Sequence, residues 1–238
     1  MSEDFLDSPH FAAVSQELFA DHDERATMQR VCEQALAVVP SAELCDITVR
    51  RRRGRLETAT STDDLAAWCG EMQQELGEGP CLDAALDDTS YLVRSTRNDT
   101  RWPRWGPRVA DAGINSALGV ELPAPRWHPR SDPLGSINLY SRRAGALDEA
   151  ALERAEVYAV HAANAIAVAK LVSGLKEAVD SRHRIGLAQG ILMQRYGIDA
   201  ERAFDLLERY ASTTSTKLRD VAAGVVESGG LPDPDPVG

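Results

Sequence analysis

The chain has 238 residues, 43% of them hydrophobic, and a formal net charge of −11. This length and hydrophobic content are enough to bury a core in one or two domains, and we take two as the working number. The first residues, MSEDFLDSPHF, lack the apolar centre of a signal peptide, and no stretch approaches the roughly 18 uninterrupted apolar residues of a membrane span. Composition therefore predicts a soluble, cytoplasmic protein.

The negative charge is unevenly spread along the chain. Residues 171–229 contain eight basic and eight acidic side chains, so the remaining residues carry the whole net charge. A neutral segment repels a polyanion less than an acidic one does, but it is not a basic patch. Charge alone therefore does not predict a nucleic-acid partner.

Residues 1–147 alternate between helix-like and strand-like patterns. A helix is predicted over Asp23–Val38, followed by a β-hairpin in LCDITVRRRRGRLETATST that turns at RRG. A second helix, DDLAAWCGEMQQEL, is ended by the glycines and proline of GEGPC. The segments SYLVRS, SALGVELPA and LGSINLYSR are strand-like, and RWPRWGPRVADAG is a connector with a short helix. These patterns predict an α+β domain in which an antiparallel sheet is flanked by helices.

Residues 148–182 are predicted to form a long connecting helix. Proline is absent from this segment, alanine is abundant, and apolar residues recur with the spacing 3, 4, 3, 4, as in the heptad seam of a coiled coil. The alternative is a helix packed on its own domain. The residues of this candidate seam are Ala165, Val168, Val172, Leu175 and Val179.

Residues 183–230 predict three short helices. The first ends at Gly197, Asp199 is placed to cap the second, and the third follows the polar loop STTST and ends at Gly229. The tail 231–238, LPDPDPVG, is predicted to be disordered. The apolar positions that we expect in the bundle core are Ile185, Ala188, Leu192, Tyr196, Ala203, Phe204, Leu206, Leu207, Leu218, Val221, Ala222, Val225 and Val226.

A bare glycine, Gly190, stands in the middle of the first of these helices, within LAQGILMQRYG. Glycine in a helix interior costs about 1 kcal/mol relative to alanine. The sequence therefore predicts that another molecule comes close to the backbone at this position. The alternative is that tight packing between helices requires the missing side chain.

The run RIGLAQGILMQRYGIDAERAFDLLERYASTTSTKLRDVAAGVV, residues 184–226, resembles the ANTAR family of RNA-binding transcription antitermination domains. The resemblance rests on AQGILM, followed by AFDLL and KLRDVA. The preceding residues, including LGEGPCLDA, resemble the GAF sensor domain that precedes ANTAR modules in actinobacterial regulators. The resemblance implies a GAF-like sensor over 1–147, an ANTAR RNA-binding domain over 183–230, and a regulator that is not an enzyme.

Proteins of the ANTAR family bind RNA that has two neighbouring stem-loops, read unstacked loop bases, and prevent a terminator hairpin from forming. Loop bases are the usual targets of sequence-specific RNA recognition. The resemblance implies that Gly190 lets a base or ribose approach the backbone, that Gln189 offers its amide to a base edge, and that Met193 provides a contact surface. Core packing is the alternative for Met193.

The resemblance also implies phosphate contacts from Lys217 and Arg219, with Arg209 as a further candidate. The alternative for Arg219 is an ion pair with a neighbouring carboxylate on the bundle. Many relatives have Lys at the position of Gln189 and Arg at that of Glu208. Losing these positive charges weakens phosphate attraction, so we expect affinity to depend on dimerisation or activation.

The sequence does not identify the signal of the sensor domain. GAF domains share a fold while binding cyclic nucleotides, haem, bilins or small metabolites, or nothing. No cofactor and no metal is predicted. Haem would need His128 or His161, and redox sensing would use Cys69 and Cys81, but a lone histidine and thiols without C-x-x-C spacing are more often structural. The tryptophans either line a pocket or pack in the core: Trp68, Trp102, Trp105 and Trp127.

Three classes of function are consistent with these patterns. The first is a signal-responsive RNA-binding antitermination regulator that binds tandem stem-loops as a homodimer. The second is a DNA-binding helix-turn-helix regulator, although neither candidate recognition helix is rich in Arg, Asn and Gln. The third is a GAF-type redox enzyme of the methionine sulfoxide reductase kind, for which a closely spaced cysteine set is missing.

Overall fold

The structure is a computed structural model that describes residues 13, 16–19, 23–51, 54–87, 89–125 and 133–231. The chain divides into two compact units, Met1–Val172 and Ser173–Gly238. Helix α7 (Glu149–Tyr196) contributes residues to both units. Most of the tail that the sequence predicts to be disordered, residues 232–238, lies outside the described residues.

The first unit is built on a five-stranded antiparallel sheet with the strand order β2-β1-β5-β4-β3. β1 and β2 form the predicted hairpin, and β5 pairs with β1 so that Ile137 lies opposite Ile47. The antiparallel sheet with flanking helices confirms the predicted α+β fold class. The strands are β1 (Leu44–Arg50), β2 (Leu56–Ser61), β3 (Tyr91–Val93), β4 (Ser116–Leu122) and β5 (Gly135–Ser141).

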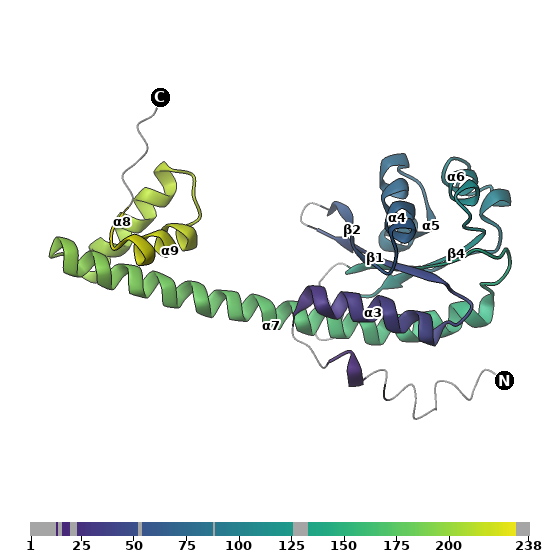
Figure 1. Ribbon diagram of the computed structural model, residues 1–238, viewed down its shortest axis with the longest axis horizontal. Coiled ribbons are helices and arrows are strands. Elements are labelled where there is room, and N and C mark those ends of the chain that lie inside the picture. Colours follow the sequence, from purple (N-terminus) through teal and green to yellow (C-terminus); the bar gives the residue numbers. More distant parts are fainter. Residues whose placement is uncertain are drawn as a thin grey trace. The chain divides into compact units, whose positions relative to one another are not determined.

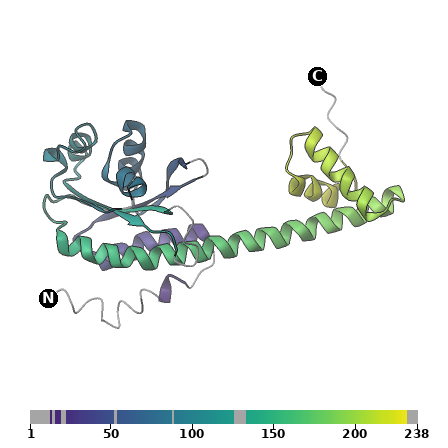
Figure 2. The same ribbon diagram turned by 180° about the vertical axis from the view of Figure 1, so that it is seen from behind.

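One face of the sheet is covered by helix α3 (Glu24–Val38) and by the first part of α7 (Figures 1 and 2). Asp23 caps α3 by accepting a hydrogen bond from the amide of Ala26 at 2.8 Å. Alanines 155, 159 and 162 of α7 are buried in the same core. This burial accounts for the apolar composition of α7, which by length and composition alone would suffice to span a membrane.

The opposite face of the sheet carries α4 (Asp64–Leu76), α5 (Pro80–Leu86) and α6 (Trp105–Asp111), as Figure 1 shows, together with the 3-10 helix η2 (Thr96–Asn98). GEGPC ends α4 as predicted, because Gly77 follows α4 with φ 65°, but the sequence did not predict helix α5, which begins at Pro80. Trp102 and Trp105 are buried here with ring centroids 6.4 Å apart. Their role is core packing.

The second unit is a three-helix bundle of the C-terminal part of α7, α8 (Ala200–Thr213) and α9 (Leu218–Ser228). Gly197 follows α7 with φ 63°, and Asp199 caps α8 by accepting a hydrogen bond from the Arg202 amide at 2.9 Å, as predicted. Phe204 is only half-buried and is not among the residues packed on the bundle core, and two further core predictions are wrong. Tyr196 is 49% exposed because it lies in the last turn of α7, and Val226 is exposed because Val225 takes the inward position. The buried core is Ala188, Leu192, Ala203, Leu207, Ala211, Val221, Ala222 and Val225.

Candidate RNA interface and sensor interior

Gly190 lies on the exposed side of α7, away from the bundle core. A Cβ atom added there would have open space around it, with no atom of the described residues within 4 Å apart from its chain neighbours and the backbone of its own helix. Gly186, one helical turn earlier, is equally open. Packing within the described chain therefore does not explain why glycine is present at either position.

Gln189 and Met193 both have contacts inside the bundle. The Gln189 side chain donates a hydrogen bond from Nε2 to the carbonyl oxygen of Ala200 at 3.0 Å, so it holds the start of α8 against α7. Met193 is half-buried and packs against the bundle core, which is the alternative that the sequence left open. Gln189 retains its carbonyl oxygen and a second N–H as groups that can read a base.

Arg219 is engaged by two carboxylates. Its Nη1 lies 3.6 Å from Oε2 of Glu177 on α7, and its Nε lies 3.7 Å from Oδ1 of Asp220. The structure therefore contains the alternative that the sequence left open, in which Arg219 forms ion pairs with neighbouring carboxylates. The sequence did not identify Glu177 as the partner, because it lies far from Arg219 along the chain. Lys217 directly precedes α9 and Arg209 lies on α8, and both are exposed.

The six predicted RNA-contact residues are not gathered at one point. Gln189 contacts Ala200 at the start of α8, whereas Arg219 contacts Glu177, which lies nearer the N-terminal end of α7. Gln189 and Glu177 are roughly 12 residues apart along α7, which is about 18 Å at the helical rise of about 1.5 Å per residue. A base at Gly190 and a phosphate at Arg219 would therefore belong to different nucleotides.

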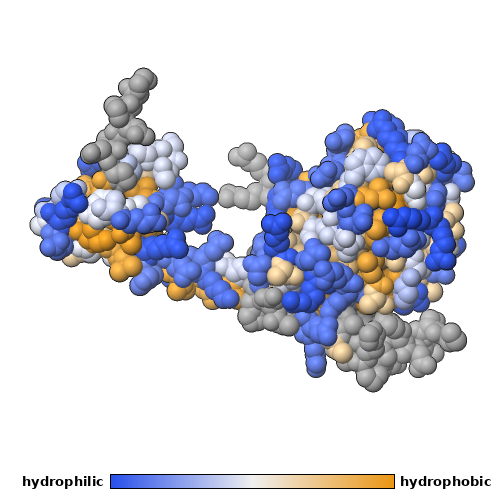
Figure 3. Space-filling view, in the orientation of Figure 1, coloured by the Kyte–Doolittle hydropathy of each residue, from blue (hydrophilic) through white to orange (hydrophobic). Residues whose placement is uncertain are grey.

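The predicted dimer seam is corrected at its first position. Ala165 is only 2% exposed and belongs to the core of the first unit, because this part of α7 covers the sheet. Val168 and Val172 are half-buried. Leu175 and Val179 are 64% and 57% exposed, and hydrophobic surface is visible along the middle of α7 in Figure 3. The exposed part of the seam therefore begins beyond the first unit.

A buried polar cluster, which sequence reasoning missed, lies between the sheet and α4 and α5. The Asp46 carboxylate of β1 accepts hydrogen bonds from Tyr140 Oη at 2.7 Å and from Asn138 Nδ2 at 2.7 Å. Thr48 donates to the same carboxylate at 3.5 Å and lies 3.2 Å from the Cys81 sulfur. Burial raises the pKa of Asp46 to about 7, against the opposing effect of these hydrogen bonds.

The four cysteines are all buried and unpaired. Burial raises the pKa of Cys81 to about 12, and it raises the pKa of Cys69 as well. Because the thiolate is the nucleophilic form, such thiols are poorly reactive at neutral pH. This environment argues against the redox-enzyme alternative. Of the two candidate haem ligands, His161 is half-buried on α7, and His128 lies outside the described residues, as does Trp127.

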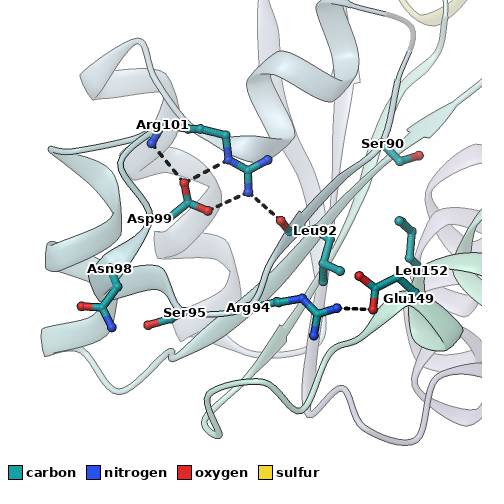
Figure 4. Close-up of a pocket in the computed structure, with 9 residues that line it drawn as sticks. All are labelled: Ser90, Leu92, Arg94, Ser95, Asn98, Asp99, Arg101, Glu149 and Leu152. Atoms are coloured by element: carbon teal, nitrogen blue, oxygen red, sulfur yellow. Dashed lines mark hydrogen bonds and ion pairs between the residues drawn. The ribbon is translucent and has the colours of Figure 1, made fainter.

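A surface cavity of about 580 Å³ lies beside the edge strand β3 (Figure 4). Arg94 points toward Glu149 of α7 and pairs with it. Arg101 pairs with Asp99 at 2.6 Å and donates a hydrogen bond to the carbonyl oxygen of Leu92 at 2.6 Å. Both arginines are therefore matched by carboxylates of the same unit, and the cavity presents no excess charge of either sign for a ligand.

The structure is that of a two-domain protein, an α+β domain with helices on both faces of its sheet followed by a small helical bundle. The family model of the GAF domain matches residues 21–167, and that of the ANTAR domain matches residues 173–226. The chain belongs to the GAF family and continues into an ANTAR domain, which is the architecture of antitermination regulators. This domain pair indicates a signal-sensing regulator and not an enzyme.

Solved structures match over the first unit and beyond it. The GAF domain of a phosphoenolpyruvate-protein phosphotransferase from Coxiella burnetii has a TM-score of 0.55 and 14% identity, covering 73% of this chain and 98% of that one. The corresponding domain from Acinetobacter has a TM-score of 0.54 and 16% identity, with the same coverage. The free methionine-R-sulfoxide reductase from Neisseria meningitidis, solved with its substrate, has a TM-score of 0.50 and 12% identity, covering 67% and 87%.

These identities are low enough that the likeness shows the fold alone. The likeness to the reductase therefore does not support a redox-enzyme function for this chain, and the burial of its thiols disfavours that function. No curated protein matches the chain.

Proposed function

We propose that this protein is a transcription antitermination regulator that binds RNA with two neighbouring stem-loops as a homodimer, in response to a signal received by its GAF domain. The observation that carries the proposal is the open backbone at Gly190, in the middle of a helix of the ANTAR domain. Residues 1–147 would be the sensor, 148–182 the connecting helix and 183–230 the RNA-binding part. Action on nascent transcripts requires a cytoplasmic location.

The loop bases would be read on the exposed side of α7. A base or ribose can lie against the backbone at Gly190 and Gly186 because no side chain occupies that space. Gln189 borders this surface, and its amide is already held in place by Ala200, so it loses little freedom on binding a base edge. Met193 would act mainly through the core, supporting the helix from within.

Phosphates would be bound by exposed basic side chains, with Lys217 and Arg209 as the principal contacts. Arg219 can join them because its ion pairs with Glu177 and Asp220 are long and exposed, and such surface pairs contribute about 1 kcal/mol or less. A phosphate could therefore replace these carboxylates as the partner of the guanidinium group.

Dimerisation would compensate for the neutral charge of the bundle. Two linked bundles make the second loop contact intramolecular, which raises overall affinity by about 10² to 10⁴ when the geometry permits. Leu175 and Val179 supply exposed apolar surface at heptad spacing for a second copy of the chain.

A gel-shift comparison tests the proposal. Full-length protein should bind an RNA with two adjacent stem-loops more tightly than the same RNA with one loop, and should bind a DNA duplex of equal length weakly. Preferential binding to the DNA duplex would instead favour the helix-turn-helix alternative. Equal, weak binding to all three would contradict the proposal.

A further inference from the structure

The buried carboxylate of Asp46 is held by uncharged hydrogen-bond donors. Asp46 on β1 lies directly opposite Asn138 on β5, and both side chains face the layer that contains α4 and α5. Tyr140, two residues further along β5, donates to the other carboxylate oxygen. Asp46 is fully buried, so water does not solvate this carboxylate.

No cationic side chain compensates a negative charge on Asp46 within the part of the chain that the structure describes. The titratable groups that interact electrostatically with it are Cys45 of β1, Cys69 of α4, Cys81 of α5 and Tyr140 of β5, and none of them is basic. From β2, the nearby group is the hydroxyl of Thr58. Burying an ionised carboxylate without a counter-charge is costly, and the group tends to take up a proton instead.

When Asp46 is ionised, the cluster contains a buried acceptor atom for which the described residues supply no hydrogen-bond donor. Asn138 is 1% exposed, and its Oδ1 atom has no hydrogen-bond partner although the Nδ2 atom has two acceptors. Buried polar atoms are nearly always paired, so an unpaired acceptor beside an ionised carboxylate marks a place where a proton is favoured. A neutral Asp46 would add one O–H donor to the cluster.

Helix α4 rests directly on this carboxyl group. A Cβ atom at Gly70 would lie 3.3 and 3.4 Å from the two Asp46 oxygens and 2.7 Å from Thr58 Oγ1. Gln73, one turn later on α4, accepts a hydrogen bond from the amide of Cys81 at 2.8 Å and so connects α4 to α5. Opening this layer would let water reach Asp46, and the charged form would favour that opening.

We propose that Asp46 is a proton-binding switch of the GAF domain, whose neutral form holds α4 and α5 on the sheet and whose ionisation loosens them. This inference is independent of RNA recognition, since it concerns the signal that the sensor receives. The direction of the effect follows from burial. The pKa of Asp46 is about 7 in the folded domain, above the ordinary value of 3.8, so stability is lost as the pH rises from about 4 to about 7.

Carbon-13 NMR of the side-chain carboxyl groups tests the switch in the full-length protein. The Asp46 signal, identified by its loss in Asp46→Asn, should titrate with a midpoint near pH 7. Tyr140→Phe should raise this midpoint, because it removes a hydrogen bond to the charged form, and its shifted signal identifies Asp46 if Asp46→Asn does not fold. A midpoint below about pH 5 would overturn the proposal.

Hydrogen exchange tests whether the proton controls packing. Between pH 6 and pH 8, the protection factors of α4 and α5 amides should fall about tenfold, as expected if opening restores an ordinary carboxyl pKa. Asp63→Asn is the matched control, because asparagine preserves the N-cap of α4 while removing an exposed carboxylate. The control should keep the pH effect and Asp46→Asn should lose it, whereas an unchanged effect in Asp46→Asn contradicts the switch.

Discussion

Two glycines of the GAF domain and two of the ANTAR domain have opposite surroundings. In the GAF domain, a Cβ at Gly119 would lie 2.5 Å from the Pro80 carbonyl oxygen, and one at Gly106 would collide with the backbone of Thr96. In the ANTAR domain, Cβ atoms at Gly186 and Gly190 would meet nothing within 4 Å among the described residues apart from their chain neighbours and the backbone of their own helix. The first pair is explained by internal packing, whereas packing within the described residues does not explain the second pair.

The polar groups of the two domains follow the same division. Asp46 and Asn138 are buried in the GAF domain, where a change in protonation acts on packing. Arg209 and Lys217 are exposed on the ANTAR bundle, where they are available to a partner. These polar groups are therefore enclosed by their own domain in the first case and open to solvent in the second.

The largest expected effect comes from the exposed seam. The double variant Leu175→Glu, Val179→Glu should be monomeric, because the new charges would face each other across a buried interface. It should lose about 10²- to 10⁴-fold in affinity for a two-loop RNA and little for a single loop. Light scattering and RNA titrations measure both. A monomer with undiminished two-loop affinity would exclude the avidity mechanism.

Gly119→Ala should destabilise the GAF domain by about 1–3 kcal/mol, because the added methyl group overlaps the backbone of α5. Gly190→Ala is the matched control in the ANTAR domain. It should stabilise the bundle by up to about 1 kcal/mol, since alanine is the better helix former and the space is open. Urea denaturation measures the change in the free energy of unfolding for both variants. If Gly190→Ala destabilises the protein as much as Gly119→Ala does, the proposed difference between the two positions is wrong.

Lys217→Ala should weaken RNA binding by a smaller factor than the seam variant does, and it should make the affinity less dependent on salt concentration. The slope of log affinity against log salt concentration should fall by about 0.7 for one lost phosphate contact with single-stranded RNA. Arg25→Ala, which removes an exposed positive charge from the GAF domain, is the control and should keep the wild-type slope. An unchanged slope in Lys217→Ala would show that Lys217 makes no phosphate contact in the interface.

The smallest expected effect is at the loop between α8 and α9. Ser215 has a φ of 54°, in the left-handed region that glycine adopts without strain. Ser215→Gly should therefore stabilise the bundle by up to about 1 kcal/mol without changing RNA affinity. Thermal unfolding followed by circular dichroism measures the gain, and a loss of stability would mean that the serine side chain has an unrecognised contact.

Local signals in the sequence predicted most of the helix ends and strands, although not helix α5, which begins within GEGPC. Asp199 and Gly197 mark helix ends through capping geometry, and GEGPC ends α4 through the conformation of Gly77. These signals depend on residues within a few positions of one another. For this reason they could be recognised without knowledge of the tertiary structure.

Contacts between distant residues were not predictable in this way. A 3, 4, 3, 4 spacing does not distinguish a coiled-coil helix from a core helix, and Ala165 belongs to the core. The pairing of Arg219 with Glu177 depends on how α9 packs against α7. Asp46, in a strand with alternating residues, could equally have faced water, and only the sheet register brings Asn138 opposite it.

The account of RNA recognition depends most directly on the open backbone at Gly190. Titration of a two-loop RNA with Gly190→Leu, and with Gly174→Leu at another open position of α7 as the control, measures its contribution. We predict that Gly190→Leu keeps the circular dichroism spectrum of the wild type but no longer binds RNA, while Gly174→Leu binds normally. Wild-type RNA affinity in a folded Gly190→Leu protein would contradict the account, and an unfolded bundle would return Gly190 to a packing role.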